Sequence, residues 1–229
     1  MNYKRMVPNS ISGLSQMLGL ISIYLSMEKD FSLAAIFIIL AILADSCDGR
    51  AARALGVSGP FGVEMDSLCD VCSFGMAPSV LIYTYSLHEL GVAGMIISGL
   101  FAFGAAMRLA RFNVNVSDIH GYFQGMPAPA GACVIVTFVL GGMQIGPVLT
   151  SILTVAVACL MYSDVKYPDF KGHGNPLFRV PVIISFILGA LVLYSDLKAW
   201  PFVIMFTYTL CGVLNAVYVK VTGKQAVFK

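Results

Sequence analysis

Long apolar runs, interrupted by short polar segments, fill almost the whole chain. A helix that crosses the hydrocarbon core of a bilayer needs about 20 mostly apolar residues. The pattern therefore predicts about eight membrane-spanning helices, and the fold class we expect is all-α, a polytopic membrane helical bundle. The expected spans are Ile11–Met27, Phe31–Leu55, Asp66–Leu87, Gly91–Arg111, Pro127–Gly142, Pro147–Tyr162, Pro176–Tyr194 and Ala199–Tyr218.

The connections between these runs alternate in length. The very short ones lie at Glu28–Asp30, His88–Glu89, Gly141–Gly142 and Asp196–Lys198. The longer ones, which are polar and rich in Gly and Pro, lie around residues 56–65, 112–126 and 163–175. With eight crossings, this alternation puts the long loops and both termini on one side of the membrane and the tight turns on the other.

Composition and charge support a membrane protein and give its orientation. Hydrophobic residues make up 58% of the chain and charged residues only 11%, against about 25% charged in soluble domains. This excludes a water-soluble domain, a disordered chain and a nucleic-acid binder with a basic face. Of the 14 Lys and Arg residues, Lys29 and Lys198 fall on the tight-turn side and the others on the long-loop side. Because basic loops stay inside, we expect a single domain, residues 1–229, in the cell membrane with long loops and termini facing the cytoplasm.

Four carboxylates do not fit the pattern of solvated loop residues. Asp45 and Asp48 close one apolar run at spacing i, i+3, and Asp66 and Asp70 open the next at spacing i, i+4. Each spacing places its pair on one helix face, and the two helices are joined on the cytoplasmic side. Such a cluster is costly unless cations neutralise it. Hard divalent cations prefer oxygen ligands and often share them with substrate phosphates. We therefore expect a two-metal Mg²⁺ or Mn²⁺ site; ordinary helix-end aspartates are the alternative.

The residues between the two aspartate pairs indicate what kind of substrate would bind beside the cations. Gly49 and Ala52 leave room for a bulky group to approach the helix backbone. Arg53 supplies a planar fork suited to phosphate oxygens, and Gly62 lies four residues before Asp66. Together these features favour phosphoryl-group chemistry on a nucleotide-bearing substrate.

These residues form a recognisable pattern. Asp45-x-x-Asp48-Gly49-x-x-Ala52-Arg53, followed after eight residues by Gly62-x-x-x-Asp66-x-x-x-Asp70, resembles the signature of the CDP-alcohol phosphatidyltransferase family. The resemblance implies a core of six helices, a homodimer, and two divalent metals held by the four aspartates, with Asp70 also acting as general base. It further implies a binding site for the CDP-linked lipid made by Gly49, Ala52, Arg53 and Gly62. Pro8-Asn9 with Ser12 resembles the Pro-Asn-x-x-Thr segment of many members, with Ser in place of Thr, which adds Asn9 to the donor site.

A second stretch of the sequence indicates which acceptor substrate the family resemblance implies. Arg108-Leu-Ala-Arg111-Phe-Asn113, followed by Phe-Gln124-Gly-Met-Pro-Ala-Pro-Ala130, resembles the family members that transfer a phosphatidyl group to L-serine and release CMP. The resemblance implies CDP-diacylglycerol as donor, or CDP-archaeol where the lipid tails are isoprenoid ethers.

The residue types in this stretch suit such an acceptor. A carboxylate in a partly dry site needs a cation, which Arg108 and Arg111 can supply, although both could instead be interfacial anchors that extend toward the headgroups. Asn113 and Gln124 can hydrogen-bond the serine ammonium or carboxylate, or can simply stabilise a loop.

Two other functions remain open. The same chemistry could use glycerol 3-phosphate or inositol phosphate as acceptor, with Arg108 and Arg111 binding the second phosphate. A divalent-cation carrier would instead need carboxylates deep in several helices and reaching both faces, whereas here they cluster at one end of the predicted bundle.

Overall fold

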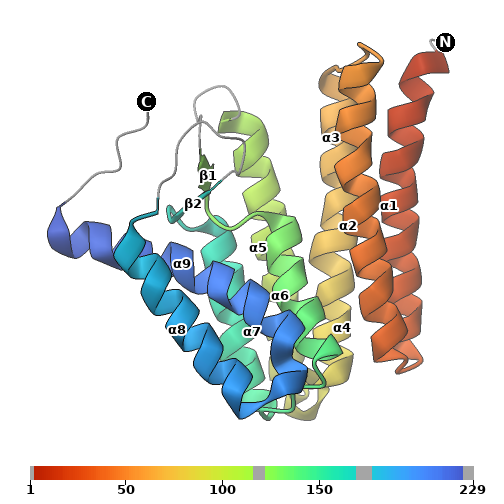
Figure 1. The fold of residues 1–229 in the computed structure, drawn as a ribbon. Helices are drawn as coiled ribbons and strands as arrows, with labels where there is room; N and C mark the ends of the chain where they lie inside the picture. The colour runs from red at the N-terminus through yellow and green to blue at the C-terminus, as the bar shows by residue number, and fades with distance from the viewer. Residues whose placement is uncertain (1–2, 116–121, 169–176, 224–229) are drawn as a thin grey trace.

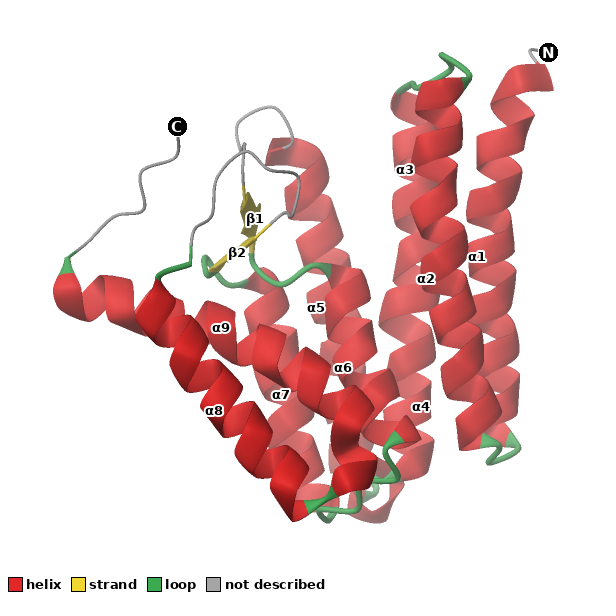
Figure 2. Ribbon diagram, viewed as in Figure 1, coloured by secondary structure: helices red, strands yellow, loops and turns green. Residues whose placement is uncertain are grey.

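A computed structural model describes residues 3–115, 122–168 and 177–223, and these form helices with one small two-stranded sheet (Figure 2). The prediction of an all-α membrane bundle is confirmed. In chain order the elements are α1 (Tyr3–Met27), α2 (Phe31–Ala54), α3 (Pro60–Asp70), a π-helical turn (Val71–Met76), α4 (Ala77–Tyr85), a 3₁₀ turn (Leu87–Leu90), α5 (Val92–Asn115), β1 (Tyr122–Gln124), α6 (Ala128–Leu140), α7 (Pro147–Tyr162), β2 (Lys166–Pro168), α8 (Arg179–Ser195), a second 3₁₀ turn (Leu197–Ala199) and α9 (Trp200–Thr222).

Each predicted apolar run forms a helix, and the described helices fall into two length classes. Five stretches are long and apolar enough to cross a membrane, namely Met6–Met27, Phe31–Ala54, Pro60–Tyr85, Val92–Val114 and Leu197–Thr222. The helices α6, α7 and α8 are apolar but shorter. The protein is therefore a multi-pass membrane protein.

The helix that carries the second aspartate pair begins earlier than the apolar pattern indicates. We expected a span from Asp66, but α3 already begins at Pro60, because proline suits the first position of a helix, where no N–H partner is needed. Asp66 therefore lies well inside α3. The helix-end interpretation, which relies on the dipole of the first turn, does not apply to it.

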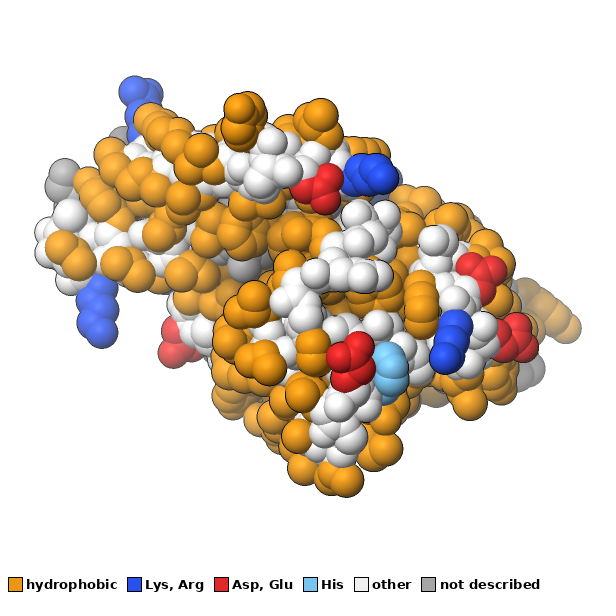
Figure 3. Space-filling view, turned by 90° about the horizontal axis from the view of Figure 1, so that it is seen from below, with side chains coloured by type: hydrophobic (Ala, Val, Ile, Leu, Met, Phe, Trp, Pro, Cys, Tyr) orange, Lys and Arg blue, Asp and Glu red, His pale blue; other side chains and the backbone are white. Residues whose placement is uncertain are grey.

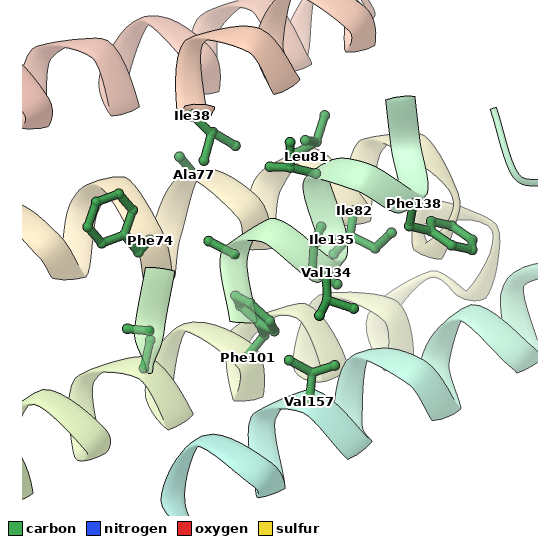
Figure 4. Close-up of a cluster of buried hydrophobic side chains, with 14 of the residues drawn as sticks. Ile38, Phe74, Ala77, Leu81, Ile82, Phe101, Val134, Ile135, Phe138 and Val157 are labelled. Carbon is green, nitrogen blue, oxygen red and sulfur yellow. The ribbon is translucent and has the colours of Figure 1, made fainter. Parts of the chain in front are cut away.

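The hydrophobic core lies around α4 and α6 (Figure 4). Ile38 of α2, Leu81 of α4 and Phe101 of α5 are fully buried there, together with Val134 of α6 and Val157 of α7. Most of α6 is buried among its neighbours, so this helix is shielded from lipid and does not need the full length of a membrane span.

The two strands join the long connections that follow α5 and α7. β1 pairs antiparallel with β2, with Phe123 opposite Tyr167 and Gln124 opposite Lys166. The ring of Tyr167 is fully buried and fills the space beside Gly212 of α9, where a Cβ atom would collide with it. The apolar pattern did not predict this sheet, because three-residue strands carry no measurable periodicity.

The two ends of the bundle differ in character. The first turn of α1, the α2–α3 connection and the sheet lie toward the upper end in Figure 1, and the tight turns lie at the lower end. The lower face is mainly hydrophobic, with a few scattered charged side chains (Figure 3). The longer connections and the tight turns thus segregate to opposite ends, as the sequence predicted.

Candidate active site

Carboxylates from two consecutive helices meet near the upper end of the bundle. Asp45 and Asp48 project from α2 and Asp66 from α3, and each offers one carboxylate oxygen such that the three atoms lie within 4.8 Å of one another. Asp70, the last residue of α3, interacts electrostatically with Asp45 and Asp66. Asp48 and Asp70 are buried, with exposed fractions of 5% and 7%. The i, i+3 and i, i+4 spacings therefore bring the four side chains together, as expected.

The carboxylate cluster fits divalent cations. One oxygen of Asp66 and one of Asp70, Oδ1 in each case, are buried and have no hydrogen-bond partner among the residues the structure describes. A buried acceptor without a donor is costly, and adjacent carboxylates repel one another. Hard cations with oxygen ligands, such as Mg²⁺ and Mn²⁺, relieve both costs, and Asp45, Asp48, Asp66 and Asp70 are the residues that would hold them.

A serine on α1 fixes the orientation of one of these carboxylates. The Ser12 hydroxyl donates a hydrogen bond of 2.6 Å to Oδ2 of Asp48, and the Pro8 carbonyl lies 3.2 Å from the same hydroxyl. A hydroxyl has one hydrogen, so the shorter contact to the charged acceptor is the stronger one. Asp48 is thus held with one oxygen bound to Ser12 and the other available to a ligand.

A pocket of about 480 Å³ opens beside the cluster, between α1, α2, α3 and α5. It brings together ten of the thirteen residues that the sequence singles out. The predicted residues that line it are Asn9, Asp48, Gly49, Ala52, Arg53, Gly62, Asp66, Asp70, Arg108 and Asn113. Those that do not line it are Asp45, Arg111 and Gln124; Asp45 still belongs to the carboxylate cluster.

Two glycines, Gly49 and Gly62, line the pocket without a side chain. A Cβ atom at Gly62 would lie 3.8 Å from Oδ1 of Asn9, so α3 and α1 face each other there without a side chain between them. A Cβ atom at Gly49 would lie 3.5 Å from a terminal nitrogen of Arg53, one turn further along α2. The arrangement leaves backbone surface and a guanidinium facing the same space.

The α5 wall of the pocket carries a cation and an amide. Arg108 is buried, with an exposed fraction of 7%, and its guanidinium lies 5.1 Å from the centre of the Phe112 ring. Its charge interacts with those of Asp70 and Asp45. Asn113 donates from Nδ2 to the Ser67 hydroxyl at 2.9 Å, which links α5 to α3 across the pocket.

Arg111 and Gln124 lie outside this pocket. The Arg111 guanidinium donates to backbone carbonyls at the end of α7 and on β1, and Nε2 of Gln124 donates to Asp164 at 2.7 Å. The acceptor-binding role that the sequence suggests for these two residues stays a prediction. Their contacts support a different role, which is argued below.

Several lining residues were not predicted from the sequence as site residues, and Ser67 and Phe112 are two of them. Both stand next to residues that it did identify, Ser67 after Asp66 and Phe112 before Asn113. The helical spacing could have found Ser67, since it lies three residues before Asp70 on the same helix. The position of Phe112 against Arg108 depends on side-chain packing that the sequence alone does not give.

Comparisons with known proteins agree with this site. Residues 5–169 match the profile of the family described as CDP-alcohol phosphatidyltransferase. A Helicobacter pylori protein named CDP-diacylglycerol--serine O-phosphatidyltransferase is 34% identical over 93% of this chain and 92% of its own. A Bacillus subtilis protein of the same name is 33% identical over 76% of this chain and 94% of its own. The archaetidylserine synthase of Methanothermobacter thermautotrophicus is 36% identical over 73% of this chain and 72% of its own.

The matched region contains every residue of the carboxylate cluster and of the pocket lining. The site geometry and the extent of these matches therefore lead to one conclusion: the chain belongs to the CDP-alcohol phosphatidyltransferase family.

Proposed function

We propose that this protein transfers a phosphatidyl or archaetidyl group from a CDP-linked lipid to the hydroxyl of L-serine and releases CMP. The observation that carries the proposal is the pocket in which the carboxylate cluster and the buried Arg108 face one space. A diphosphate donor with bound cations and an acceptor with a carboxylate need these two kinds of group side by side. The names of the relatives from Helicobacter pylori and Bacillus subtilis support serine as the acceptor.

The donor would lie along the α1–α3 side of the pocket. Arg53 binds its phosphate oxygens, and Gly49, Ala52 and Gly62 let the cytidine and ribose approach the helix backbones. Asn9, which faces Gly62 across the pocket, supplies an amide to the same group. The lipid tails remain in the bilayer, as diacyl esters in CDP-diacylglycerol or isoprenoid ethers in CDP-archaeol.

We further propose that Asp45, Asp48, Asp66 and Asp70 hold two divalent cations, Mg²⁺ or Mn²⁺. When bound, such cations neutralise the charge of the diphosphate and of the departing phosphate. Ser12 keeps Asp48 in the orientation that this binding requires.

The acceptor would lie against α5. Arg108 binds the serine carboxylate with its planar fork, and Asn113 hydrogen-bonds the same molecule. Asp70 takes the proton from the serine hydroxyl. The serine oxygen then forms a bond to the phosphorus that bears the lipid, the bridging P–O bond of the diphosphate breaks, and CMP departs beside Arg53. A direct displacement of this kind needs no covalent enzyme intermediate.

The surroundings of the site complete the proposal. We infer that residues 1–229 form one domain in the cell membrane, that the pocket and both termini face the cytoplasm, and that the protein is a homodimer. The orientation is supported by the excess of Lys and Arg on the side of the longer connections. The homodimer is supported by the family resemblance alone.

The test is CMP release by the purified protein in nanodiscs, with CDP-diacylglycerol and either Mg²⁺ or Mn²⁺. L-Serine, glycerol 3-phosphate and inositol phosphate are compared as acceptors, and CDP-archaeol is tested as a second donor. We expect release that requires serine and a divalent cation. Release with a phosphorylated acceptor alone would keep the family chemistry and overturn serine as the substrate. Absence of release with every donor and acceptor would contradict the proposal as a whole.

A further inference from the structure

Two arginines lie one turn apart on α5 and have opposite surroundings. Arg108 is buried and lines the pocket, where its guanidinium lies 5.1 Å from the centre of the Phe112 ring. Arg111 donates from Nη1 to the carbonyl of Tyr162 at 2.8 Å. Its Nη2 donates to the carbonyls of Gln124 at 3.0 Å and Ser163 at 2.8 Å.

Further contacts complete the environment of the Arg111 guanidinium. The Met161 carbonyl lies 3.4 Å from Nη2, a carboxylate oxygen of Asp164 lies 3.5 Å from Nη1, and the centre of the Tyr162 ring lies 4.7 Å from Cζ. The two terminal nitrogens of an arginine carry four N–H groups, and these acceptors occupy them. No pair of N–H groups remains on them for a bidentate contact with a substrate carboxylate.

The acceptors of Arg111 belong to two segments distant in sequence. The carbonyls of residues 161–163 end α7, where the last carbonyls of a helix have no partner within the helix. The carbonyl of Gln124 belongs to β1, and its side chain reaches Asp164 as well. Arg111 therefore fastens the upper part of α5 to the end of α7 and to the sheet, on the side away from the carboxylate cluster.

We propose that Arg111 is a positioning residue that holds the α5 wall, and with it Arg108, at the distance from the carboxylates that the acceptor requires. This inference rests on the proposed function, in which Arg108 binds the carboxylate of the acceptor. Three residues of helix separate the two arginines, a rise of about 4.5 Å, so a shift of α5 at Arg111 moves Arg108 as well. From the pocket side, the contact of Asn113 with Ser67 holds the same wall.

Gly125 provides an independent way to disturb this fastening. Its φ angle is +75°, in the region that favours glycine, and a Cβ atom there would collide with the Met161 carbonyl oxygen and would lie 2.6 Å from Nη2 of Arg111 and 2.9 Å from the Ser163 carbonyl oxygen. Gly125 does not line the pocket. Gly125→Ala should therefore disturb the contact between the Arg111 guanidinium and the carbonyls at the end of α7, without altering any group that we assign to substrate binding.

The experiment compares Arg111→Lys, Arg111→Gln and Gly125→Ala with the wild type and with the control Arg179→Lys, at an exposed arginine that begins α8. Two measurements are made in nanodiscs. The first is hydrogen exchange of peptides covering residues 122–126 and 160–165, without substrates. The second is the KM for serine, the KM for CDP-diacylglycerol and kcat.

We expect faster exchange in both peptides for all three variants and a rise in the KM for serine of about tenfold or more, because small misplacements of binding groups have large effects. The KM for the donor should remain near that of the wild type. Arg111→Lys and Arg111→Gln should raise the KM for serine to a similar extent, because neither side chain has the planar fork that donates to carbonyls of two segments. The control should match the wild type in every measurement.

Three results would overturn the inference. Unchanged exchange in Arg111→Lys would show that the guanidinium does not fasten the segments. Faster exchange with an unchanged KM for serine would show that the fastening does not position the acceptor site. If Arg111→Lys had an almost normal KM for serine while Arg111→Gln did not, Arg111 would be a direct ligand of serine. If the wild type uses another acceptor, the proposed function fails, and the same KM comparison with that acceptor still decides the role of Arg111.

Discussion

The polar groups on the two sides of the pocket differ in whether they have partners within the chain. On the α2–α3 side, Asp66 and Asp70 each bury an oxygen that has no donor among the described residues. Behind the α5 wall, the terminal nitrogens of Arg111 are fully used by carbonyls and by Asp164. Arg108, between the two, is buried and lines the pocket.

The difference separates groups that bind ligands from groups that build the site. Burying a polar group without a partner costs free energy, so such a group beside a pocket is a candidate for contact with a ligand. A guanidinium whose terminal nitrogens are fully used by partners within the chain, as in Arg111, contributes stability and geometry instead. We propose on this basis that Asp66 and Asp70 contact substrates or cations, as does Arg108 at the pocket, and that Arg111 is part of the framework.

The largest effect should come from the carboxylate assigned as the base. Asp70→Asn keeps the size of the side chain and removes its ability to take a proton, so we expect kcat to fall by about 10³-fold. Binding of CDP-diacylglycerol, measured at equilibrium in nanodiscs, should be largely retained. Glu64→Gln, at an exposed position on the same helix, is the matched control and should remain active. Near-normal turnover in Asp70→Asn would remove Asp70 from the role of base.

The second-largest effect should come from substitution of Arg108. Arg108→Gln removes the buried charge, and losing a charge-assisted contact to a carboxylate should raise the KM for serine by about two orders of magnitude. The KM for the donor should change little. Arg50→Gln replaces an exposed arginine on α2 that does not line the pocket and serves as control. A rise in the donor KM equal to that for serine would show that Arg108 serves the whole pocket rather than the acceptor.

A smaller effect is expected where one side chain acts through another. Ser12→Ala removes the 2.6 Å hydrogen bond to Asp48, and loss of such a supporting contact should raise the Mn²⁺ concentration for half-maximal activity about tenfold. Ser12→Thr restores the hydroxyl and should behave like the wild type. Ser46→Ala, whose hydroxyl bonds only within its own helix to Ile42, is the control. An unchanged Mn²⁺ requirement in Ser12→Ala would contradict the supporting role.

The smallest effect should come from the exposed partner of Arg111. The Asp164 side chain is 86% exposed and lies 3.5 Å from the guanidinium, and exposed ion pairs of this kind contribute little. Asp164→Asn should therefore change the KM for serine by about twofold at most. A loss as large as that of Arg111→Lys would show that the ion pair, rather than the backbone carbonyls, fastens α5.

The sequence predicted most of the fold because a bilayer imposes a simple rule on it. Every span must be a long apolar helix with its backbone bonds satisfied internally, and the apolar runs show where these helices lie. Local proline chemistry moved the start of α3 to Pro60, which the apolar pattern could not show. The β1–β2 pairing was not predicted because its strands are three residues long and far apart in sequence.

The candidate site was predictable where it depends on helix geometry and unpredictable where it depends on distant packing. The spacings place Asp45 with Asp48 and Asp66 with Asp70 on one face of their helices, and the short α2–α3 connection lets the two pairs meet. Arg108 and Arg111 differ by only about 60° around α5, and this rotation is enough to direct one to the pocket and the other to α7. The partners of Arg111 at the end of α7 lie about fifty residues further along the chain, and nothing in the local sequence identifies them.

The length of chain between Arg111 and its partners also sets an order of assembly. The helices that carry the carboxylates are complete at residue 70, whereas the last carbonyl that Arg111 contacts is present only once residue 163 has been made. At translation rates of about 5–20 residues per second, the contacts that hold the α5 wall beside Arg108 can form only several seconds after the carboxylate cluster. In a nascent chain the carboxylate cluster can thus form before the contacts of Arg111 that fix the α5 wall.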